Sequence, residues 1–260
     1  MPRRGRASLA LALLLVACAR PEERPPALAD AVACPHLAPP EAFGTITRED
    51  LDELSGLVAS RRHPGVLWTH NDSGARPTLT ALRPTGEVIA DLELAGAAAV
   101  DWEDIALGPG PEPGVDYLYI GDIGDNRRRR VEIVVYRLPE PDPHALAAGP
   151  AALAAEPLVL RYPGEPENAE ALIVDPSTGD LYLITKGERA HLYRADGSAL
   201  KHEATLDLGV GALATAADIS PAGDRLVIRT YNRAYLWPRA PGQPLAAALA
   251  APPCDLPVAA

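Results

Sequence analysis

Short apolar runs separated by polar turn sequences recur along most of the chain. Dipeptides such as Pro64-Gly65, Thr85-Gly86 and Asp196-Gly197 divide the runs, which are rich in β-branched and aromatic residues. Such runs between glycine- or proline-containing turns are typical of strands. The one alanine-rich patch, 143–155, also contains glycine and proline, so we interpret it as a loop insertion with one helical turn. The pattern predicts an all-β domain.

The runs recur in the same order four times, which indicates an internal repeat of about 45 residues. Each first run is a small or acidic pair followed by an aliphatic residue, and second, third and fourth runs follow it. The first runs are 54–58, 102–106, 169–173 and 216–220; the second are 67–72, 118–122, 181–186 and 226–231; the third are 78–82, 132–138, 191–194 and 234–237; the fourth are 88–94, 158–162, 204–208 and, weakly, 244–249.

Four antiparallel strands in about 45 residues match one blade of a β-propeller. The innermost strand of a blade lines a central channel, and Ser55, Glu103, Glu170 and Asp218 lie at or beside corresponding positions of the first runs. The alternative, a β-sandwich, gives no reason for acids at one recurrent position. We therefore predict a propeller with four recognisable blades. An incomplete fifth stays open, because 43–46 is a loose strand candidate and the tail after Leu249 is too short for a blade.

Several segments together resemble an uncharacterised bacterial family of exported β-propellers, distantly similar to phytase-like and NHL-type propellers. They are LSGLVASRRHPGVLWTHNDSG, DWEDIALG, YLYIGDIGDN, NAEALIVDPSTGDLYLITK and ADISPAGDRLVIRTYNRAYLW, within about 51–237. The family pattern continues into a further blade that opens with a Gly-Glu-Ala-type strand, which this sequence lacks. The resemblance thus leaves open a truncated member, a four-bladed closure, or a ring completed by a partner.

The N-terminus has the features of an export signal. Three arginines precede a short apolar stretch, 9–16, which ends in Leu-Val-Ala-Cys at Cys18. This resembles a bacterial lipobox; the alternative is an ordinary secretory peptide with a chance cysteine. We expect a lipoprotein signal peptide at 1–17, a flexible tether at 18–33 and the propeller domain at 34–260. A lipid on Cys18 would anchor the protein to a membrane of the bacterial cell envelope. By family analogy, Ala19 after the cysteine favours the outer membrane.

The acidic charge limits the choice of partners. Residues 1–17 contain three arginines and no acid, so their removal changes the formal net charge from −11 to −14. Such a surface disfavours nucleic acid and suits cations. The partner is then an unidentified protein or small-molecule ligand.

Two cysteines remain in the expected mature chain, Cys34 and Cys254, at the two ends of the domain. An even number of cysteines in an exported protein predicts a disulfide. The alternative is two free, buried thiols.

Acidic and amide side chains collect at the ends of the expected inner strands, where oxygen ligands suit Ca²⁺. Asn71 and Asp72 occupy the equivalent place in the first blade, and Lys186 and Arg229 occupy equivalent second-strand positions in the third and fourth. These four are the candidate ligand-binding residues, and the two basic ones could instead balance the acids in a salt-bridge network without metal. The candidate metal ligands are Asp101, Glu103, Asp104, Asp122, Asp125, Asn126, Glu170 and Asp218, with Asn168 nearby.

Catalytic motifs are weak. The chain has no G-x-S-x-G elbow and no H-E-x-x-H, and the candidate bases are Glu103, Glu170 and His70. His70 is equally explained as a hydrogen-bonded strand residue. The arginine run 127–130 could grip an anion or form a solvated loop. The sequence predicts a lipoprotein that binds a ligand or partner at an acidic channel mouth with Ca²⁺; the alternative is a Ca²⁺-dependent hydrolase of phosphoesters or lactones.

Overall fold

A computed structural model of the chain describes residues 34–35, 38–72, 74, 76–149 and 151–258. These residues belong to one compact unit, Cys34–Ala260. The expected signal peptide, its cysteine and the tether lie outside the described residues. No helix in the described part of the chain is long and apolar enough to span a membrane.

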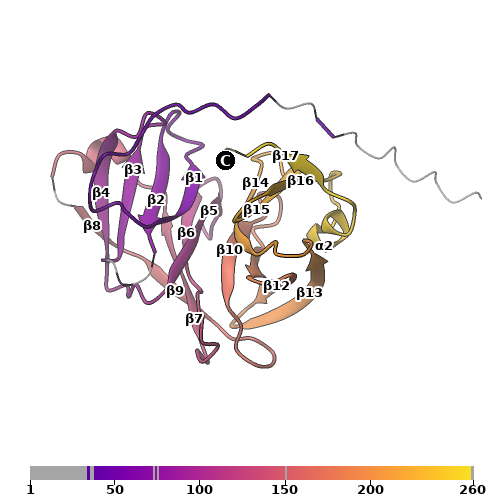
Figure 1. Cartoon of the computed structure of the whole chain (residues 1–260). Helices are drawn as coiled ribbons and strands as arrows, with labels where there is room; N and C mark the ends of the chain where they lie inside the picture. The colour runs from indigo at the N-terminus through magenta and orange to yellow at the C-terminus, as the bar shows by residue number, and fades with distance from the viewer. Residues whose placement is uncertain (1–33, 36–37, 73, 75, 150, 259–260) are drawn as a thin grey trace, which may run out of the picture. The chain divides into compact units, whose positions relative to one another are not determined.

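The described strands form four sheets that are the blades of a β-propeller (Figure 1). Within a blade, consecutive strands pair antiparallel from the inner to the outer edge, so the predicted all-β propeller is confirmed. Blade 1 contains β1 (Leu54–Ala59), β2 (Leu67–Asn71), β3 (Thr78–Leu82) and β4 (Val88–Ala95); blade 2 contains β5 (Trp102–Pro109), β6 (Asp116–Asp122), β7 (Ile133–Pro139) and β9 (Glu156–Leu160); blade 3 contains β10 (Ala169–Val174), β11 (Leu181–Thr185), β12 (Arg189–Asp196) and β13 (Ala199–Asp207); blade 4 contains β14 (Ala214–Ile219), β15 (Arg225–Thr230), β16 (Ala234–Pro238) and β17 (Cys254–Leu256).

The alanine-rich insertion joins the first two blades. After β7 the chain forms the single turn α1 (Pro143–Leu146), whose first residues are capped by the Asp142 side chain. It then forms β8 (Ala151–Ala154), which pairs parallel to β4 at the outer edge of blade 1 before the chain returns to blade 2. The predicted helical turn is confirmed, whereas β8 was not predicted.

The end of blade 4 differs from the prediction. The segment expected as its fourth strand is largely the helix α2 (Leu245–Leu249), which buries Leu245 and Leu249. A short apolar segment can cover a hydrophobic core either as a helix or as a strand. Its sequence pattern alone does not distinguish the two. The fourth strand is β17, three residues in the tail after Leu249, which pairs with β16. The loose strand candidate 43–46 belongs to no described strand.

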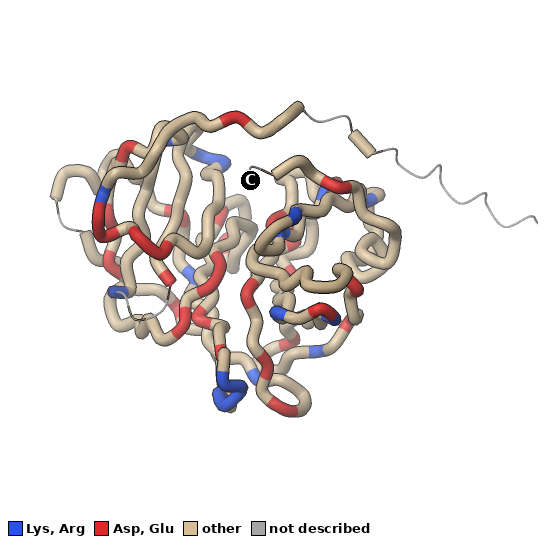
Figure 2. The backbone as a smooth tube through the Cα atoms, viewed as in Figure 1, with Lys and Arg blue, Asp and Glu red and all other residues tan. Residues whose placement is uncertain are grey.

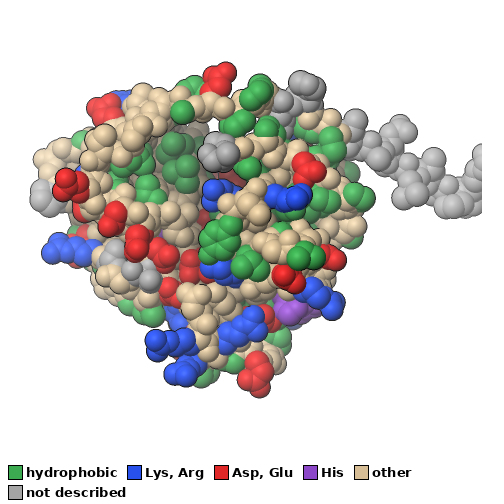
Figure 3. All heavy atoms as spheres, viewed as in Figure 1, with side chains coloured by type: hydrophobic (Ala, Val, Ile, Leu, Met, Phe, Trp, Pro, Cys, Tyr) green, Lys and Arg blue, Asp and Glu red, His purple; other side chains and the backbone are tan. Residues whose placement is uncertain are grey.

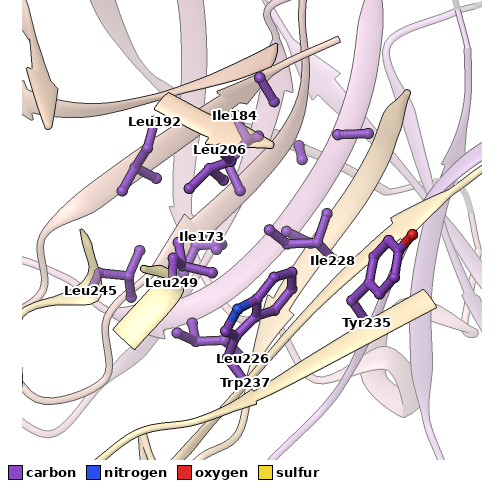
Figure 4. Packing of buried hydrophobic residues seen from close by; sticks show 14 of the residues in the cluster. Ile173, Ile184, Leu192, Leu206, Leu226, Ile228, Tyr235, Trp237, Leu245 and Leu249 are labelled. Atoms are coloured by element: carbon purple, nitrogen blue, oxygen red, sulfur yellow. The ribbon is translucent and has the colours of Figure 1, made fainter. Parts of the chain in front are cut away.

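Three buried hydrophobic clusters lie between successive blades. One joins blades 1 and 2 around Trp68 and Trp102, and a second joins blades 2 and 3 around Tyr119 and Leu183. The third joins blades 3 and 4 and includes Trp237 (Figure 4). Each of these blade interfaces stabilises the folded domain by removing apolar area from water, at roughly 25 cal/mol per Å².

No such cluster among the described residues joins blade 4 to blade 1. The inner strands show the consequence directly. Strand β10 is buried at every position, because a blade packs on each of its faces. Strand β1 instead alternates, with Val58 buried and Leu57 55% exposed. Although β1 and β14 touch, this seam lacks the hydrophobic interface of the other three.

A segment before β1 crosses the seam, and we call residues 38–53 the strap (Figure 1). Arg48 pairs with Asp91 of blade 1 at 2.7 Å. The strap follows Cys34, which forms a disulfide with Cys254 of β17 in blade 4. The predicted disulfide is confirmed, and it connects the two blades that share no hydrophobic cluster.

We expect the double variant C34A/C254A to lower the free energy of unfolding by about 2–5 kcal/mol. The disulfide closes a long loop and tethers the seam, so its loss frees the unfolded chain and removes a connection between blades 1 and 4. Urea unfolding of the variant and of the wild type, each with and without reductant, measures the difference. Reductant should destabilise only the wild type; equal stability of all four samples would contradict the role assigned to the disulfide.

Candidate functional site

Each inner strand carries a β-bulge at the same place, and the bulges define the site. The pairing register between first and second strands shifts just after Leu54, Trp102, Ala169 and Ala214. A bulge adds one residue to its strand and re-aims side chains there. The added residues are Ser55, Glu103, Glu170 and Thr215, and all four line one cavity.

This register corrects the equivalence drawn from the sequence for blade 4. Thr215, not Asp218, corresponds to Glu103 and Glu170, because Ala214 pairs with Thr230 as Ala169 pairs with Thr185. The sequence alignment matched the acid that precedes an aliphatic residue in each first run. It therefore placed the first run of blade 4 two residues too far toward the C-terminus. Asp218 lines a separate cavity beside Arg61.

A similar correction applies to the basic residues. Arg229 pairs with Ala216 within the ladder. Lys186 instead follows the last residue of β11, so its counterpart in blade 4 is Tyr231, directly after β15. Lys186 and Arg229 are thus not equivalent, although both reach the same cavity.

The cavity at the channel mouth has a volume of about 490 Å³, and we call it the mouth pocket. The wall of the mouth pocket combines the four bulge residues with residues that follow second strands. Figure 2 shows acids on the inner strands, and Figure 3 shows acidic and basic side chains side by side near the middle of the visible face. The lining residues are Leu54, Ser55, Leu57, Asp72, Glu103, Asn126, Glu170, Lys186, Thr215, Ala216, Arg229 and Tyr231.

Asp104 lies on the channel axis and joins three blades. Its carboxylate accepts the backbone N–H groups of Ile105, Leu172 and Ala217, at 2.9, 2.9 and 3.1 Å. These residues occupy equivalent places in β5, β10 and β14, because each is the second residue after the bulge residue of its strand. Burial raises the pKa of Asp104, and the three N–H donors oppose that shift. Asp104, a candidate metal ligand from the sequence, is 1% exposed and accepts these three N–H groups.

His70 is also structural. Its ring is fully buried and contacts Trp102 edge-on, and Nδ1 lies 2.8 Å from the carbonyl oxygen of Asn71. Burial lowers the pKa of His70, which favours the neutral imidazole. A Cβ on Gly56 would approach His70 Nε2 to 2.7 Å, so glycine is needed there to admit the ring. Nδ1 of His70 thus has a hydrogen-bond partner, whereas the buried Nε2 has none among the described residues.

Asp72 and Glu103 line the mouth pocket and Asp101 lies beside them, and we call these three residues the acidic wall. One carboxylate oxygen from each of the three lies within 4.8 Å of the other two. Glu103 is 4% exposed, and no hydrogen bond reaches its carboxylate from the described residues. Gly124 packs against this group: a Cβ there would approach Glu103 Oε1 to 2.2 Å and Asp101 Oδ2 to 2.5 Å.

The crowding of these acids changes their titration. Burial, followed by the charges of Glu170, Asp72 and Asp101, raises the pKa of Glu103 to about 9. Burial and Asp72 also raise the pKa of Asp101, while Arg130 opposes the shift. Without a cation, Glu103 therefore holds a proton at neutral pH.

The opposite wall is basic and aromatic. Lys186 Nζ donates to Glu170 Oε1 at 2.8 Å and lies 5.0 Å from the centre of the Tyr231 ring. Desolvation opposes the charged form of Lys186, but the bonds to Glu170 and Tyr231 raise its pKa, so the ammonium is retained. Arg229 is exposed beside them. The mouth pocket is thus acidic on one side and cationic on the other.

Other predicted site residues are bonded elsewhere. Asp122 accepts Arg130 Nη1 at 2.8 Å and the N–H of Asp101 at 3.0 Å. Asp125 accepts the N–H of Arg130 at 2.6 Å within the turn formed by the arginine run. Asn71 donates to the Asp50 carbonyl of the strap at 2.6 Å and lines a different cavity.

The pocket also contains residues that the sequence did not single out. Thr215 and Tyr231 lack the acidic character used to select candidates. A correct alignment of the repeat would have identified both. Thr215 follows Ala214 as Glu170 follows Ala169, and Tyr231 follows Thr230 as Lys186 follows Thr185.

Comparisons with known proteins add little to this geometry. No protein-family model matches the sequence, and no curated protein matches it. Among solved structures, the Dos1 propeller aligns with 14% identity and a TM-score of 0.40, over 71% of this chain and 44% of that one. Raptor from Chaetomium thermophilum aligns with 11% identity and a TM-score of 0.41, over 76% and 16%. The chain spans less than half of either structure, and we infer nothing about function from them.

We expect Asp104→Asn to lower the free energy of unfolding by about 2–4 kcal/mol, because the amide NH2 must face buried N–H donors. Asp218→Asn is the matched control: Asp218 also accepts the N–H of the next residue, at 2.7 Å, but no N–H from another blade. Urea unfolding should show a loss below about 1 kcal/mol for the control. Equal losses in the two variants would contradict the role of Asp104 in joining the blades.

We expect Glu103→Gln to stabilise the metal-free protein increasingly as the pH rises from about 4.5 to about 9. Unfolding releases the proton that folded Glu103 retains in this range, so the wild type loses stability there and the glutamine variant does not. Denaturant unfolding in EDTA at several pH values measures the difference. Glu170→Gln, which breaks the ion pair with Lys186, should destabilise instead. A wild type more stable than E103Q at pH 8 would show that ionised Glu103 has a partner.

Proposed function

We propose that the mouth pocket is a ligand-binding site that holds a Ca²⁺ ion on its acidic wall. The observation that carries the proposal is the convergence of the Asp72, Asp101 and Glu103 carboxylates within 4.8 Å. Ca²⁺ binds oxygens at about 2.3–2.6 Å, so two of its ligands lie at most about 5 Å apart. The three carboxylates meet that limit, and carboxylate oxygen is the ligand that Ca²⁺ prefers.

Two further features favour a cation there. The Glu103 side chain is 4% exposed, and the removal of most of its water is the largest cause of its raised pKa. Gly124 leaves room for the Glu103 and Asp101 carboxylates to approach one another. A cation would also replace the proton on Glu103 and relieve the repulsion among the acids.

The ligand itself would then lie between the cation and the opposite wall. Arg229 offers positive charge, with Lys186 paired to Glu170 beside it, and Tyr231 offers a ring face, so a singly charged anionic group on a small molecule or on a partner protein suits this wall. Asn71, proposed from the sequence as a ligand contact, faces the strap instead.

The alternative of a Ca²⁺-dependent hydrolase has less support. Phosphoester chemistry needs several basic groups around the phosphate. Lys186 is paired with Glu170, and Arg130 of the arginine run is bonded to Asp122 and to the Gly124 carbonyl. A Ca²⁺-dependent screen with p-nitrophenyl phosphate, phytate and simple lactones tests the alternative; turnover that E103Q abolishes would favour it over binding alone.

The proposal includes export and a lipid anchor at Cys18 in the bacterial envelope, most simply at the outer membrane. The support is the sequence pattern of residues 1–18 and the disulfide, which fits an oxidising compartment. Globomycin should block maturation. Normal cleavage of a Cys18→Ser variant would contradict a lipoprotein signal.

We expect Ca²⁺ to raise the melting temperature of the EDTA-treated protein, with stabilisation of about 2.7 kcal/mol at a hundred times its Kd. Asp101→Asn removes one charge while preserving shape, and Gly124→Ala places a methyl group among the carboxylates. Both should weaken Ca²⁺ binding at least about tenfold by calorimetry. Asp218→Asn, in the separate cavity, is the control and should bind normally. A wild type that neither binds Ca²⁺ nor changes its melting temperature would refute the cation site.

A further inference from the structure

A second group of titratable side chains lies on blade 3, away from the mouth pocket. His191 and Tyr193 are two residues apart on β12, so their side chains share one face of the strand. Glu167, just before β10, accepts the Tyr193 hydroxyl at 2.6 Å and lies 2.8 Å from His191 Nδ1. These residues border a cavity of about 400 Å³ that also contacts Arg128 and Glu165.

The hydrogen bond to Glu167 fixes the state of His191. Burial acts to raise the pKa of Glu167, but the bonds from Tyr193 and His191 prevail and lower it, so this residue is a carboxylate. A carboxylate only accepts hydrogen bonds, and Nδ1 of His191 must therefore carry the proton. Nε2 has no hydrogen-bond partner among the described residues and is not buried, so its lone pair can bind an ion once the ring is neutral.

A second imidazole lies next to it. In the register of β12 and β13, Tyr193 faces His202 and His191 faces Thr205, so the two histidines are diagonal neighbours on one face. Their ring centroids are 5.3 Å apart. Two imidazoles that bind one ion at about 2.0–2.1 Å have centroids roughly 4.5–6 Å apart, which matches this separation.

We infer that His191 and His202 form a binding site for a divalent transition-metal ion of the Zn²⁺ and Cu²⁺ class. A histidine that gives its other ring N–H to a carboxylate is the arrangement in which metal-binding histidines are usually held. Imidazole nitrogen selects such ions over Ca²⁺, which prefers oxygen. Glu167 adds negative charge next to His191. Glu167 is thus a positioning residue, and the two histidines are the ligands.

Cu²⁺ electron paramagnetic resonance on the full chain tests the inference, with Ca²⁺ present to saturate the mouth pocket. We expect one Cu²⁺ with coupling to two imidazole nitrogens, displaced by excess Zn²⁺. His202→Ala should leave one nitrogen. His191→Gln, which keeps an N–H donor for Glu167, should weaken binding at least about tenfold, and Glu167→Gln by about 10- to 100-fold.

Two controls separate this site from other sources of signal. His144→Ala removes an exposed histidine of α1 and should change nothing. Asp101→Asn impairs the proposed Ca²⁺ site and should also leave the Cu²⁺ spectrum intact. A spectrum unchanged in both H191Q and H202A, with folding verified by circular dichroism, would overturn the inference. A spectrum lost in D101N would place the ion in the mouth pocket and overturn it as well.

Discussion

The carboxylate of Asp104 is the interaction on which the arrangement of the blades depends. A bulge interrupts the ladder of each inner strand, and the N–H groups beside it need another acceptor. Asp104 supplies that acceptor to Ile105, Leu172 and Ala217, in three different blades. Blade 1 is attached differently, through the Ser55 hydroxyl, which donates to the Glu103 carbonyl at 2.6 Å. One residue thus joins three inner strands.

The seam between blades 1 and 4 runs beside the mouth pocket, so the contacts that hold these two blades together also affect the site. The mouth pocket takes residues from both blades, so its shape depends on a seam that has no hydrophobic cluster. The strap reaches the same place: the Glu53 carbonyl accepts the N–H of Asp72 at 2.8 Å, and the Asp50 carbonyl accepts the Asn71 side chain. The disulfide at Cys34 therefore tethers a segment whose other end positions one member of the acidic wall.

The repeat made most of the fold predictable. Alternating apolar runs and turn dipeptides located the first three blades to within a few residues, because both signals are local. Blade 4 was harder. Its last strand, β17, is only three residues long, and its apolar run 245–249 forms a helix that covers the core. The pairing of β8 with β4 depends on the path of the chain between blades, which no local signal encodes.

The sequence predicted that acids gather at the site. It did not predict which acids line the pocket and which accept backbone N–H groups. Glu103 and Asp104 are adjacent, yet the bulge sends the first to the pocket and the second to the channel axis. Composition cannot distinguish two neighbouring acids; only the register of the strand can. Asp122 and Asp125 were drawn from the same pattern and instead satisfy backbone N–H groups and Arg130.

This division explains why so acidic a centre can fold. Backbone N–H groups offset part of the burial that raises the pKa of Asp104. For Glu103, burial and the nearby charges of Glu170, Asp72 and Asp101 together raise the pKa. The cost of their proximity is the physical basis for expecting a positive group between them. A proton on Glu103 meets part of that need, and a divalent cation would meet it more completely because it attracts all three carboxylates at once.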